Sequence, residues 1–442
     1  MSGPWAGRRI HLVGVGGAGM SAYARAAHAL GATLSGSDAA PGPYLERLAA
    51  DGILTAAVGH RAENVPSEQG VELYYSSAIP PQNSEREAAR ERGLPERSRA
   101  ELLGELTALR RTIAVAGTHG KTTTAAMIAH GLLAAGLQPG WLVGAPIGGG
   151  LPNAEWGEGE WLVVEADESD RSMLSLNVEI ALLTNVELDH HASFATLQEL
   201  RAAFREFLAG ASRTVVWDRP ELLELGGKDS VPYAAEGLAL TEGGSRFRFG
   251  GQDVELSVPG AHNAADAAGA LAAIALVAEE SRVARAIRAL EEFSGAGRRF
   301  QLVGETTGGA RVYEDYAHHP TEIEATLSGA RTLRHERLVA VFQPHLFSRT
   351  RLLAEEFGRA LALADAVVVL DVYPARERAE DFPGVSGLLI AERTADAAGG
   401  RPVYWLPRMA QARSVLAAML HEGDLCVVMG AGDVDGLARE LV

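Results

Sequence analysis

The sequence is poor in three things that whole classes of protein require: cysteine, long apolar runs and positive charge. Cys426 is the one cysteine among 442 residues, which excludes an intrachain disulfide framework and a cysteine-rich metal site. No stretch approaches about 18 uninterrupted apolar residues, and the first residues lack the apolar segment of a signal peptide. These absences predict a soluble, cytoplasmic protein without a membrane partner.

Positive charge is scarce because 57 Asp and Glu residues outnumber 40 Lys and Arg residues, which gives a net charge of −17. A chain this acidic repels phosphate backbones, so we expect no nucleic-acid partner. Of the 40 basic residues, only Lys121 and Lys228 are lysines. A lysine inside a glycine-rich loop is therefore more informative here than in most proteins.

Strand and helix patterns alternate along almost the whole chain, which predicts an α/β protein with mostly parallel sheets. At roughly 150 residues per domain the length predicts about three domains, and breaks in the pattern place them at 1–109, 110–295 and 296–442. The expected strands include Arg9–Val13, Thr33–Ser35, Val71–Tyr75, Thr112–Ala116, Trp161–Glu165, Ile180–Asn185, Thr214–Trp217, Val312–Asp315, Leu338–Phe342, Ala366–Leu370 and Leu425–Met429. We expect a β-hairpin within 241–259, a phosphate-loop helix at 121–134 and a buried alanine-rich helix at 263–278.

A first glycine-rich turn, Gly14 to Gly19, follows a strand and opens a helix. Such a turn brings the backbone close to a phosphate and directs a helix N-terminus at its negative charge. Asp38 ends the second strand, where a Rossmann domain keeps its ribose-binding acid. The pattern predicts pyrophosphate binding, and the glycines alone leave open an NAD ligand, a UDP-sugar or a turn with no ligand.

A second glycine loop, Gly117 to Thr123, is more specific and also lies between a strand and a helix. Its backbone amides can hold phosphates, Lys121 can reach the terminal phosphoryl oxygens, and the Thr122 hydroxyl can bind Mg²⁺. The spacing departs from the strict Walker pattern, because Val115 stands where the first glycine would be. The alternative, a Gly-Lys-Thr that only starts a helix, fits poorly with the scarcity of lysine.

Carboxylates gather after the two strands that should flank this loop. The segment Glu165–Asp170 follows one strand, and Asp189 and His190 follow the next. Parallel strands bring their carboxyl ends to one sheet edge, where ligands of α/β proteins bind, and Mg²⁺ prefers oxygen ligands. The sequence therefore predicts a magnesium site beside the phosphate loop.

Taken together and in this order, the motifs resemble the Mur ligase family over nearly the whole chain. Besides the two glycine loops, the resemblance is carried by Ser35–Asp38, Tyr75–Ile79, Arg99–Leu103, Glu165–Asp170, Gly260–Asn263, Gly297–Gln301, Asp315–Ile323, Phe342–Thr350 and Met429–Val434. It implies a Rossmann-like N-terminal domain, a central P-loop ATPase-type α/β domain and a Rossmann-like C-terminal domain. These would bind, in turn, a UDP-sugar, ATP and an amino acid.

The resemblance implies ATP-dependent ligation of L-alanine to the carboxylate of UDP-N-acetylmuramate through an acyl phosphate, in peptidoglycan synthesis. The implied partners are the small molecules ATP, UDP-N-acetylmuramate and L-alanine. The implied cofactor is Mg²⁺ at two sites, and we expect a monomer or weak homodimer. Three alternatives stay open: a murein peptide ligase that joins a recycled tripeptide to the same UDP-sugar, a nicotinamide-dependent oxidoreductase, and a non-catalytic nucleotide-binding regulator.

The resemblance also implies roles for individual residues. For ATP they are Gly117, Thr118, His119, Gly120, Lys121, Thr122, Thr123, Asn263, Arg299 and Asp315; for the UDP-sugar, Gly14, Gly16, Gly17, Ala18, Gly19, Met20, Ser37, Asp38 and Ser77; for the amino acid, Tyr316, His318 and Arg349; for catalysis, Lys121, Glu165 and His190; for metal, Thr122, Glu165 and His190. Asp266 stands where the family usually has asparagine, so any contact made by that amide nitrogen is lost. A helix-capping role for the pair His318 and His319 and a surface position for Arg349 are the structural alternatives.

Overall fold

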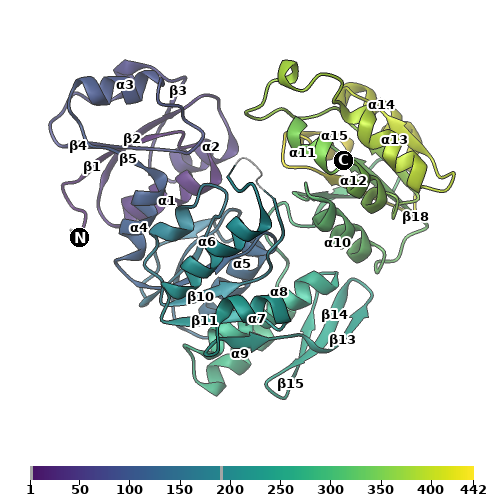
Figure 1. Cartoon of the computed structure of the whole chain (residues 1–442), viewed down its shortest axis with the longest axis horizontal. Coiled ribbons are helices and arrows are strands. Elements are labelled where there is room, and N and C mark those ends of the chain that lie inside the picture. The colour runs from purple at the N-terminus through teal and green to yellow at the C-terminus, as the bar shows by residue number, and fades with distance from the viewer. Residues whose placement is uncertain (1–2, 190–192) are drawn as a thin grey trace. The chain divides into compact units, whose positions relative to one another are not determined.

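The structure is a computed structural model that describes residues 3–189 and 193–442. Its contacts divide the chain into two compact units, one of Met1–Ala235 with Ala265–Leu290 and one of Glu236–Ala264 with Glu291–Val442. Figure 1 draws most of the first unit in purple to teal and the second in green to yellow. None of the described helices has the length and apolar character needed to cross a bilayer.

The first unit begins with a five-stranded parallel sheet in the order β3-β2-β1-β4-β5. Its elements are β1 (Arg9–Val13), α1 (Ala18–Ala29), β2 (Thr33–Asp38), α2 (Pro43–Ala50), β3 (Ala57–Val58), β4 (Val71–Tyr75), α3 (Ser84–Glu91), β5 (Glu96–Ser98) and α4 (Arg99–Thr107). The strand order reverses on either side of β1, so the first glycine turn leaves β1 at the point where α/β sheets bind ligands.

A seven-stranded sheet follows in the same unit, in the order β12-β11-β10-β6-β9-β7-β8, and only its edge strand β8 is antiparallel. Its elements are β6 (Arg111–Ala116), α5 (Lys121–Ala134), β7 (Gly140–Leu142), β8 (Ala154–Glu155), β9 (Trp161–Glu165), β10 (Ile180–Leu183), α6 (Leu197–Ala209), β11 (Arg213–Trp217), α7 (Pro220–Gly226) and β12 (Val231–Tyr233), followed later by α8 (Ala261–Ala275) and α9 (Glu280–Glu291). Because β6 lies between β9 and β10, the residues that follow these three strands meet at one sheet edge.

The second unit holds a small antiparallel sheet of β13 (Glu236–Thr241), β14 (Gly244–Phe249) and β15 (Gln252–Leu256). It also holds a six-stranded sheet in the order β16-β17-β21-β18-β19-β20, in which only β16 is antiparallel. Its elements are β16 (Gln301–Glu305), β17 (Arg311–Asp315), α10 (Pro320–Ala330), β18 (Arg337–Phe342), α11 (Phe347–Leu352), α12 (Ala354–Leu361), β19 (Ala366–Val369), α13 (Gly387–Ala397), β20 (Val403–Trp405), α14 (Met409–Met419), β21 (Asp424–Met429) and α15 (Asp435–Leu441).

The expected mostly parallel α/β sheets are confirmed, and the helix at 121–134 has the predicted bounds. The expected hairpin within 241–259 is instead a three-stranded sheet, because the exposed strand β13 begins earlier, at Glu236. That sheet groups with the second unit, although the first unit holds the chain up to Ala235 and again from Ala265 to Leu290. The antiparallel edge strand β8 has two residues, which is too short for any periodic signal.

Candidate active site

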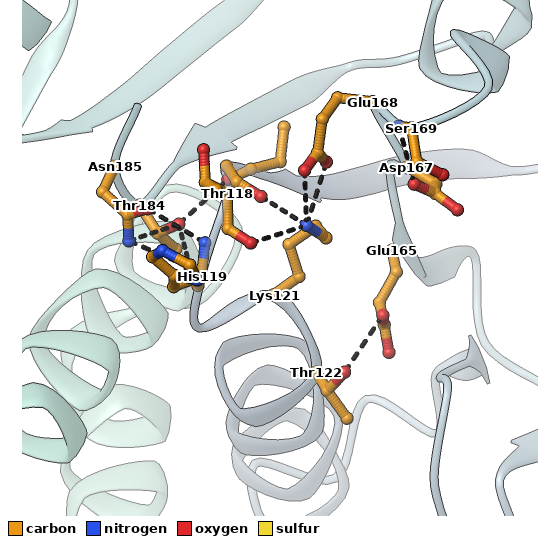
Figure 2. Close-up of polar contacts among 12 residues, drawn as sticks. Thr118, His119, Lys121, Thr122, Glu165, Asp167, Glu168, Ser169, Thr184 and Asn185 are labelled. Atoms are coloured by element: carbon orange, nitrogen blue, oxygen red, sulfur yellow. Dashed lines mark hydrogen bonds and ion pairs between the residues drawn. The ribbon is translucent and has the colours of Figure 1, made fainter. Parts of the chain in front are cut away.

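The phosphate-type loop runs from Gly117 to Gly120 and joins β6 to α5 (Figure 2). Two of its glycines are required by their conformation and surroundings. Gly117 has φ +132°, and a Cβ there would lie 2.1 Å from Oγ1 of Thr184. Gly120 has φ +81°, and a Cβ there would lie 2.5 Å from Oδ1 of Asp266. A residue with a Cβ would be strained at both positions, so the two glycines allow the tight turn that leads from β6 into the start of α5.

Polar residues just after β10 fix the shape of this loop. Asn185 binds the backbone of His119 at both ends: its Oδ1 accepts the His119 N–H at 2.9 Å, and its Nδ2 donates to the His119 carbonyl at 3.0 Å. The Thr184 hydroxyl donates to that carbonyl at 2.6 Å. The Thr118 hydroxyl donates to the Glu187 carbonyl at 2.9 Å. No role was predicted for Asn185, although it lies only two residues after the buried strand β10.

The ammonium group of Lys121 lies inside the loop. It donates to the carbonyls of Gly117 and Thr118 at 2.5 and 3.0 Å and to both carboxylate oxygens of Glu168 at 2.9 and 3.1 Å. Burial alone would lower the pKa of Lys121, but the negative charges of Glu168 and Asp167 outweigh it and raise the pKa. The lysine therefore stays positively charged at the place where a terminal phosphoryl group would arrive.

Thr122 and Glu165 form the oxygen pair that the sequence predicted for a metal. The Thr122 hydroxyl donates to Oε2 of Glu165 at 3.1 Å, and Oε1 of Glu165 accepts the Gly144 N–H at 2.5 Å. A hydroxyl and a carboxylate oxygen are ligands that suit Mg²⁺, so the residues present fit this ion. His190 lies outside the described residues, while Asp189 beside it is buried.

The carboxylates that follow β9 have different partners. Figure 2 shows Glu168 directed at Lys121 and Glu165 directed at Thr122, with Asp167 pointing away from the lysine. Asp167 and Asp170 instead accept hydrogen bonds from Arg99, at 2.8 and 2.7 Å. Burial opposes ionisation of Asp167, but the charges of Arg99 and Lys121 outweigh it and lower its pKa to about 2. We call Glu165–Asp170 the acid loop.

The first glycine turn is closed by the acid that the sequence singled out. Oδ2 of Asp38 accepts the Gly16 N–H at 2.8 Å, and a Cβ on Gly16 would lie 2.9 Å from that oxygen. Gly14 has φ +80°, and Gly17 begins α1 without a side-chain cap. The start of α1 is therefore an anchored turn with open amide groups, as expected for an anion site.

Other residues predicted for the UDP-sugar differ in their exposure to solvent. Met20 is buried in the first turn of α1, and Ser77 is exposed after β4. Ser37 is fully buried, and its hydroxyl donates to Glu85 at 2.7 Å and lies 2.9 Å from Nδ1 of His60. The side chain of Ser37 thus belongs to a buried polar network beneath the turn.

The residues predicted for the amino acid come together in the second unit. Nδ1 of His318 lies 3.0 Å from the carbonyl oxygen of Tyr316, and the two rings meet edge to face. The ring of His345 lies 6.0 Å from that of His318, and its Nδ1 is 3.3 Å from Nη1 of the buried Arg349. His345 thus links His318 to Arg349. It stands inside the Phe342–Thr350 motif, but the sequence analysis gave it no role.

Asn263, Arg299 and Asp315, three residues predicted for ATP, lie within the second unit; α8 begins there and continues into the first unit from Ala265. Both oxygens of Asp315 accept backbone N–H groups, from Phe300 at 2.8 Å and Ala317 at 2.7 Å. Burial raises the pKa of Asp315 to about 6, and the charge of Arg299 opposes this shift. The Asn263 amide donates to the Pro259 carbonyl at 2.7 Å. Their contacts with a nucleotide stay a prediction.

Three family descriptions match successive parts of the chain. The Mur ligase family catalytic domain matches residues 9–111, the Mur ligase middle domain residues 115–275, and the Mur ligase glutamate ligase domain residues 298–432.

Relatives and solved structures agree with these matches. The chain is 43% identical to a UDP-N-acetylmuramate–L-alanine ligase of Kineococcus radiotolerans, covering 98% of this chain and 95% of the relative. It is 40% identical to the enzyme of that name from Rubrobacter xylanophilus, covering 98% and 99%. The fold is similar to a UDP-N-acetylmuramate–alanine ligase of Thermotoga maritima, with a TM-score of 0.84, 27% identity and 98% of both chains covered. A murein peptide ligase of Psychrobacter arcticus gives a TM-score of 0.74 at 25% identity, again over 98% of both chains. With its three-domain α/β fold, the chain belongs to the Mur ligase family.

Proposed function

We propose that the protein joins L-alanine to the carboxylate of UDP-N-acetylmuramate with hydrolysis of ATP, forming UDP-N-acetylmuramoyl-L-alanine, ADP and phosphate in peptidoglycan synthesis. The observation that carries this proposal is the Lys121 ammonium, which Glu168 holds inside a glycine loop next to the Thr122–Glu165 pair. The choice of substrates is supported by relatives of this activity that are about 40% identical over 98% of the chain.

The chemistry explains why such a loop is needed. A carboxylate is a poor acylating agent, so one of its oxygens first attacks the γ-phosphorus of ATP, and the bond to the β-phosphate oxygen breaks to release ADP. The alanine amine then attacks the carbonyl carbon of the acyl phosphate, loses a proton, and phosphate leaves. Lys121 and the amides of the loop neutralise and orient the charge that moves during the first step. Mg²⁺ bound by Thr122 and Glu165 would add positive charge at the same phosphates.

We assign the three substrates to three segments: the UDP-sugar to 1–109, ATP to 110–295 and the amino acid to 296–442. The sugar diphosphate would lie at the first glycine turn, near Gly16 and Gly19. The Arg349 guanidinium is suited to hold the alanine carboxylate, because its planar fork matches two carboxylate oxygens. His190 is our candidate ligand for a second Mg²⁺, together with Glu165.

The test is an assay of ADP formation in which each substrate is omitted in turn. We expect ADP to appear only when ATP, Mg²⁺, UDP-N-acetylmuramate and L-alanine are all present, with one ADP per peptide bond. A preference for the tripeptide over L-alanine would identify a murein peptide ligase instead. An absorbance change with NAD(P)H, or nucleotide binding without phosphate release, would overturn the ligase assignment.

A further inference from the structure

Arg99, the first residue of α4, lies between the two proposed nucleotide sites of the first unit. Its Nε donates to Oδ2 of Asp170 at 2.7 Å, and its Nη2 donates to Oδ2 of Asp167 at 2.8 Å. The side chain of Arg99 is 17% exposed, and those of Asp167 and Asp170 are 35% and 20% exposed, so both ion pairs are partly shielded from solvent. Arg99 therefore holds two carboxylates of the acid loop. Lys121 and Thr122 contact the other two, Glu168 and Glu165.

The opposite edge of the same guanidinium faces the first glycine turn. A Cβ added to Gly19 would lie 3.5 Å from Nη1 of Arg99 and 3.8 Å from the Tyr23 hydroxyl. The hydrogen bonds of Arg99 to the described residues use Nε and Nη2, which leaves Nη1 available beside the start of α1. An anion bound at that helix start would meet both the open amides and this N–H group.

Other contacts keep this arrangement in place. The buried Asn153 donates to the Ala18 carbonyl at 3.0 Å, at the first residue of α1. The Tyr44 hydroxyl donates at 3.3 Å to the carbonyl of Gly144, the residue whose N–H binds Glu165. These bonds join the start of α1 to Asn153, and helix α2 to the residue that binds Glu165, so the segments around Arg99 are held together by neutral contacts as well.

The charges in this region explain why Arg99 would matter. Four carboxylates of the acid loop, at positions 165, 167, 168 and 170, lie within six residues. Arg99 pairs with Asp167 and Asp170, and Lys121 pairs with Glu168. Like charges at this spacing repel one another, so the conformation that presents Glu165 and Glu168 depends on Arg99 staying paired. An anion on Nη1 would fix the guanidinium and so stabilise that conformation.

We propose that Arg99 is a positioning residue that couples the UDP-sugar site to the acid loop, so that UDP-N-acetylmuramate and Mg·ATP each strengthen the binding of the other. This inference rests on the proposed function, because it needs both nucleotides to bind this unit. Binding free energies are reciprocal, so each ligand must change the affinity of the other by the same factor. The rigid guanidinium is essential, since a lysine cannot bind two carboxylates and an anion in one fixed plane.

The experiment is calorimetric titration with a non-hydrolysable ATP analogue and Mg²⁺, with and without saturating UDP-N-acetylmuramate. We expect the sugar nucleotide to tighten analogue binding roughly fivefold or more in the unmodified protein. In Arg99→Lys this factor should fall to about one, while the Kd for the analogue alone changes far less. The matched control is Arg97→Lys, because Arg97 pairs with Glu72 and Glu105 at 3.0 and 3.1 Å in the same stretch of chain. It should keep the full factor.

A second variant, Asp170→Asn, tests the same link from the acid-loop side and should also reduce the factor. Its amide oxygen can still accept the Ser172 N–H, which Asp170 binds at 3.0 Å. Absence of coupling in the unmodified protein, or full coupling in both Arg99→Lys and Asp170→Asn, would overturn the inference while leaving the ligase assignment intact. Failure of the unmodified protein to bind UDP-N-acetylmuramate would instead overturn the proposed function.

Discussion

Oε2 of Glu168 lies 2.9 Å from Nζ of Lys121, and the Glu168 side chain is only 1% exposed. This ion pair lies where we expect the γ-phosphate, and the Lys121 side chain is itself only 16% exposed. A buried carboxylate of this kind is tolerated only while a cation neutralises it. The pair therefore has two separable effects, one on folding stability and one on catalysis.

Lys121→Ala should reduce ADP formation by about a hundredfold or more, because the ammonium group acts on charge that develops in the transition state. It should also lower the melting temperature, since the buried Glu168 carboxylate would lose the ammonium group 2.9 Å away. The double variant Lys121→Ala with Glu168→Gln should recover much of the melting temperature but none of the activity. Near-normal turnover in either folded variant would contradict the role of Lys121.

Glu165→Gln should raise the Mg²⁺ concentration that gives half-maximal activity, because a neutral amide is a weaker ligand for a hard cation than a carboxylate. Gln keeps an oxygen that can accept the Gly144 N–H, so the local fold should persist. The control is Glu160→Gln, at the residue just before β9 begins, whose side chain pairs with Arg111 and is 62% exposed. An unchanged Mg²⁺ dependence in Glu165→Gln would remove Glu165 from the metal site.

Local patterns in the sequence were sufficient to predict the phosphate loop and the helix that follows it. The strand, the glycines and the lysine are contiguous, so helix α5 could be predicted with the bounds that it has. The partner of Lys121 could not be chosen, because Glu165, Asp167 and Glu168 lie within four residues and the loop decides which one faces inward. The Ser169 N–H binds Oδ1 of Asp167 at 2.9 Å, and this turn directs Glu168 to the lysine.

Contacts between residues far apart in the chain could not be predicted from the sequence either. Arg99 and Asp167 are 68 residues apart, and nothing in their spacing shows that α4 meets the acid loop. Ser37 shows that the partner of a single side chain can also depend on tertiary packing. The family resemblance implied a UDP-sugar contact for Ser37, which stays a prediction, and only the packing of α3 reveals that its hydroxyl binds the buried Glu85. Which side of a strand end faces the core is decided by tertiary structure.

Gly117→Ala should abolish binding of the ATP analogue and lower the melting temperature. Its φ of +132° strains any residue with a Cβ, and that Cβ would lie 2.1 Å from the Thr184 hydroxyl oxygen that shapes the loop. The matched control is Gly136→Ala, just after α5, which has φ +73° and open space around it. Its cost should be about 1 kcal/mol, with nucleotide binding kept. Equal effects of the two substitutions would show that the clash with Thr184 is unimportant.

His262, in the first turn of α8, gives a prediction about stability and pH. Burial, together with the positive charge of Arg299 and against the negative charge of Glu322, lowers its pKa to about 4. The unfolded chain, with a histidine pKa near 6.5, binds this proton first as the pH falls. The neutral imidazole therefore contributes stability that is present above about pH 6.5 and is lost progressively between about pH 6.5 and 4, by no more than about 3.5 kcal/mol.

His262→Gln cannot take up a proton, so its melting temperature should fall less than that of the unmodified protein between pH 7.5 and pH 5. Carboxylates elsewhere in this acidic chain titrate in both proteins, so their contribution cancels in the comparison. The control is His28→Gln, at an exposed position near the end of α1, which should follow the unmodified protein. Parallel melting curves for His262→Gln and the unmodified protein across this pH range would mean that His262 takes up its proton as readily in the folded state as in the unfolded chain.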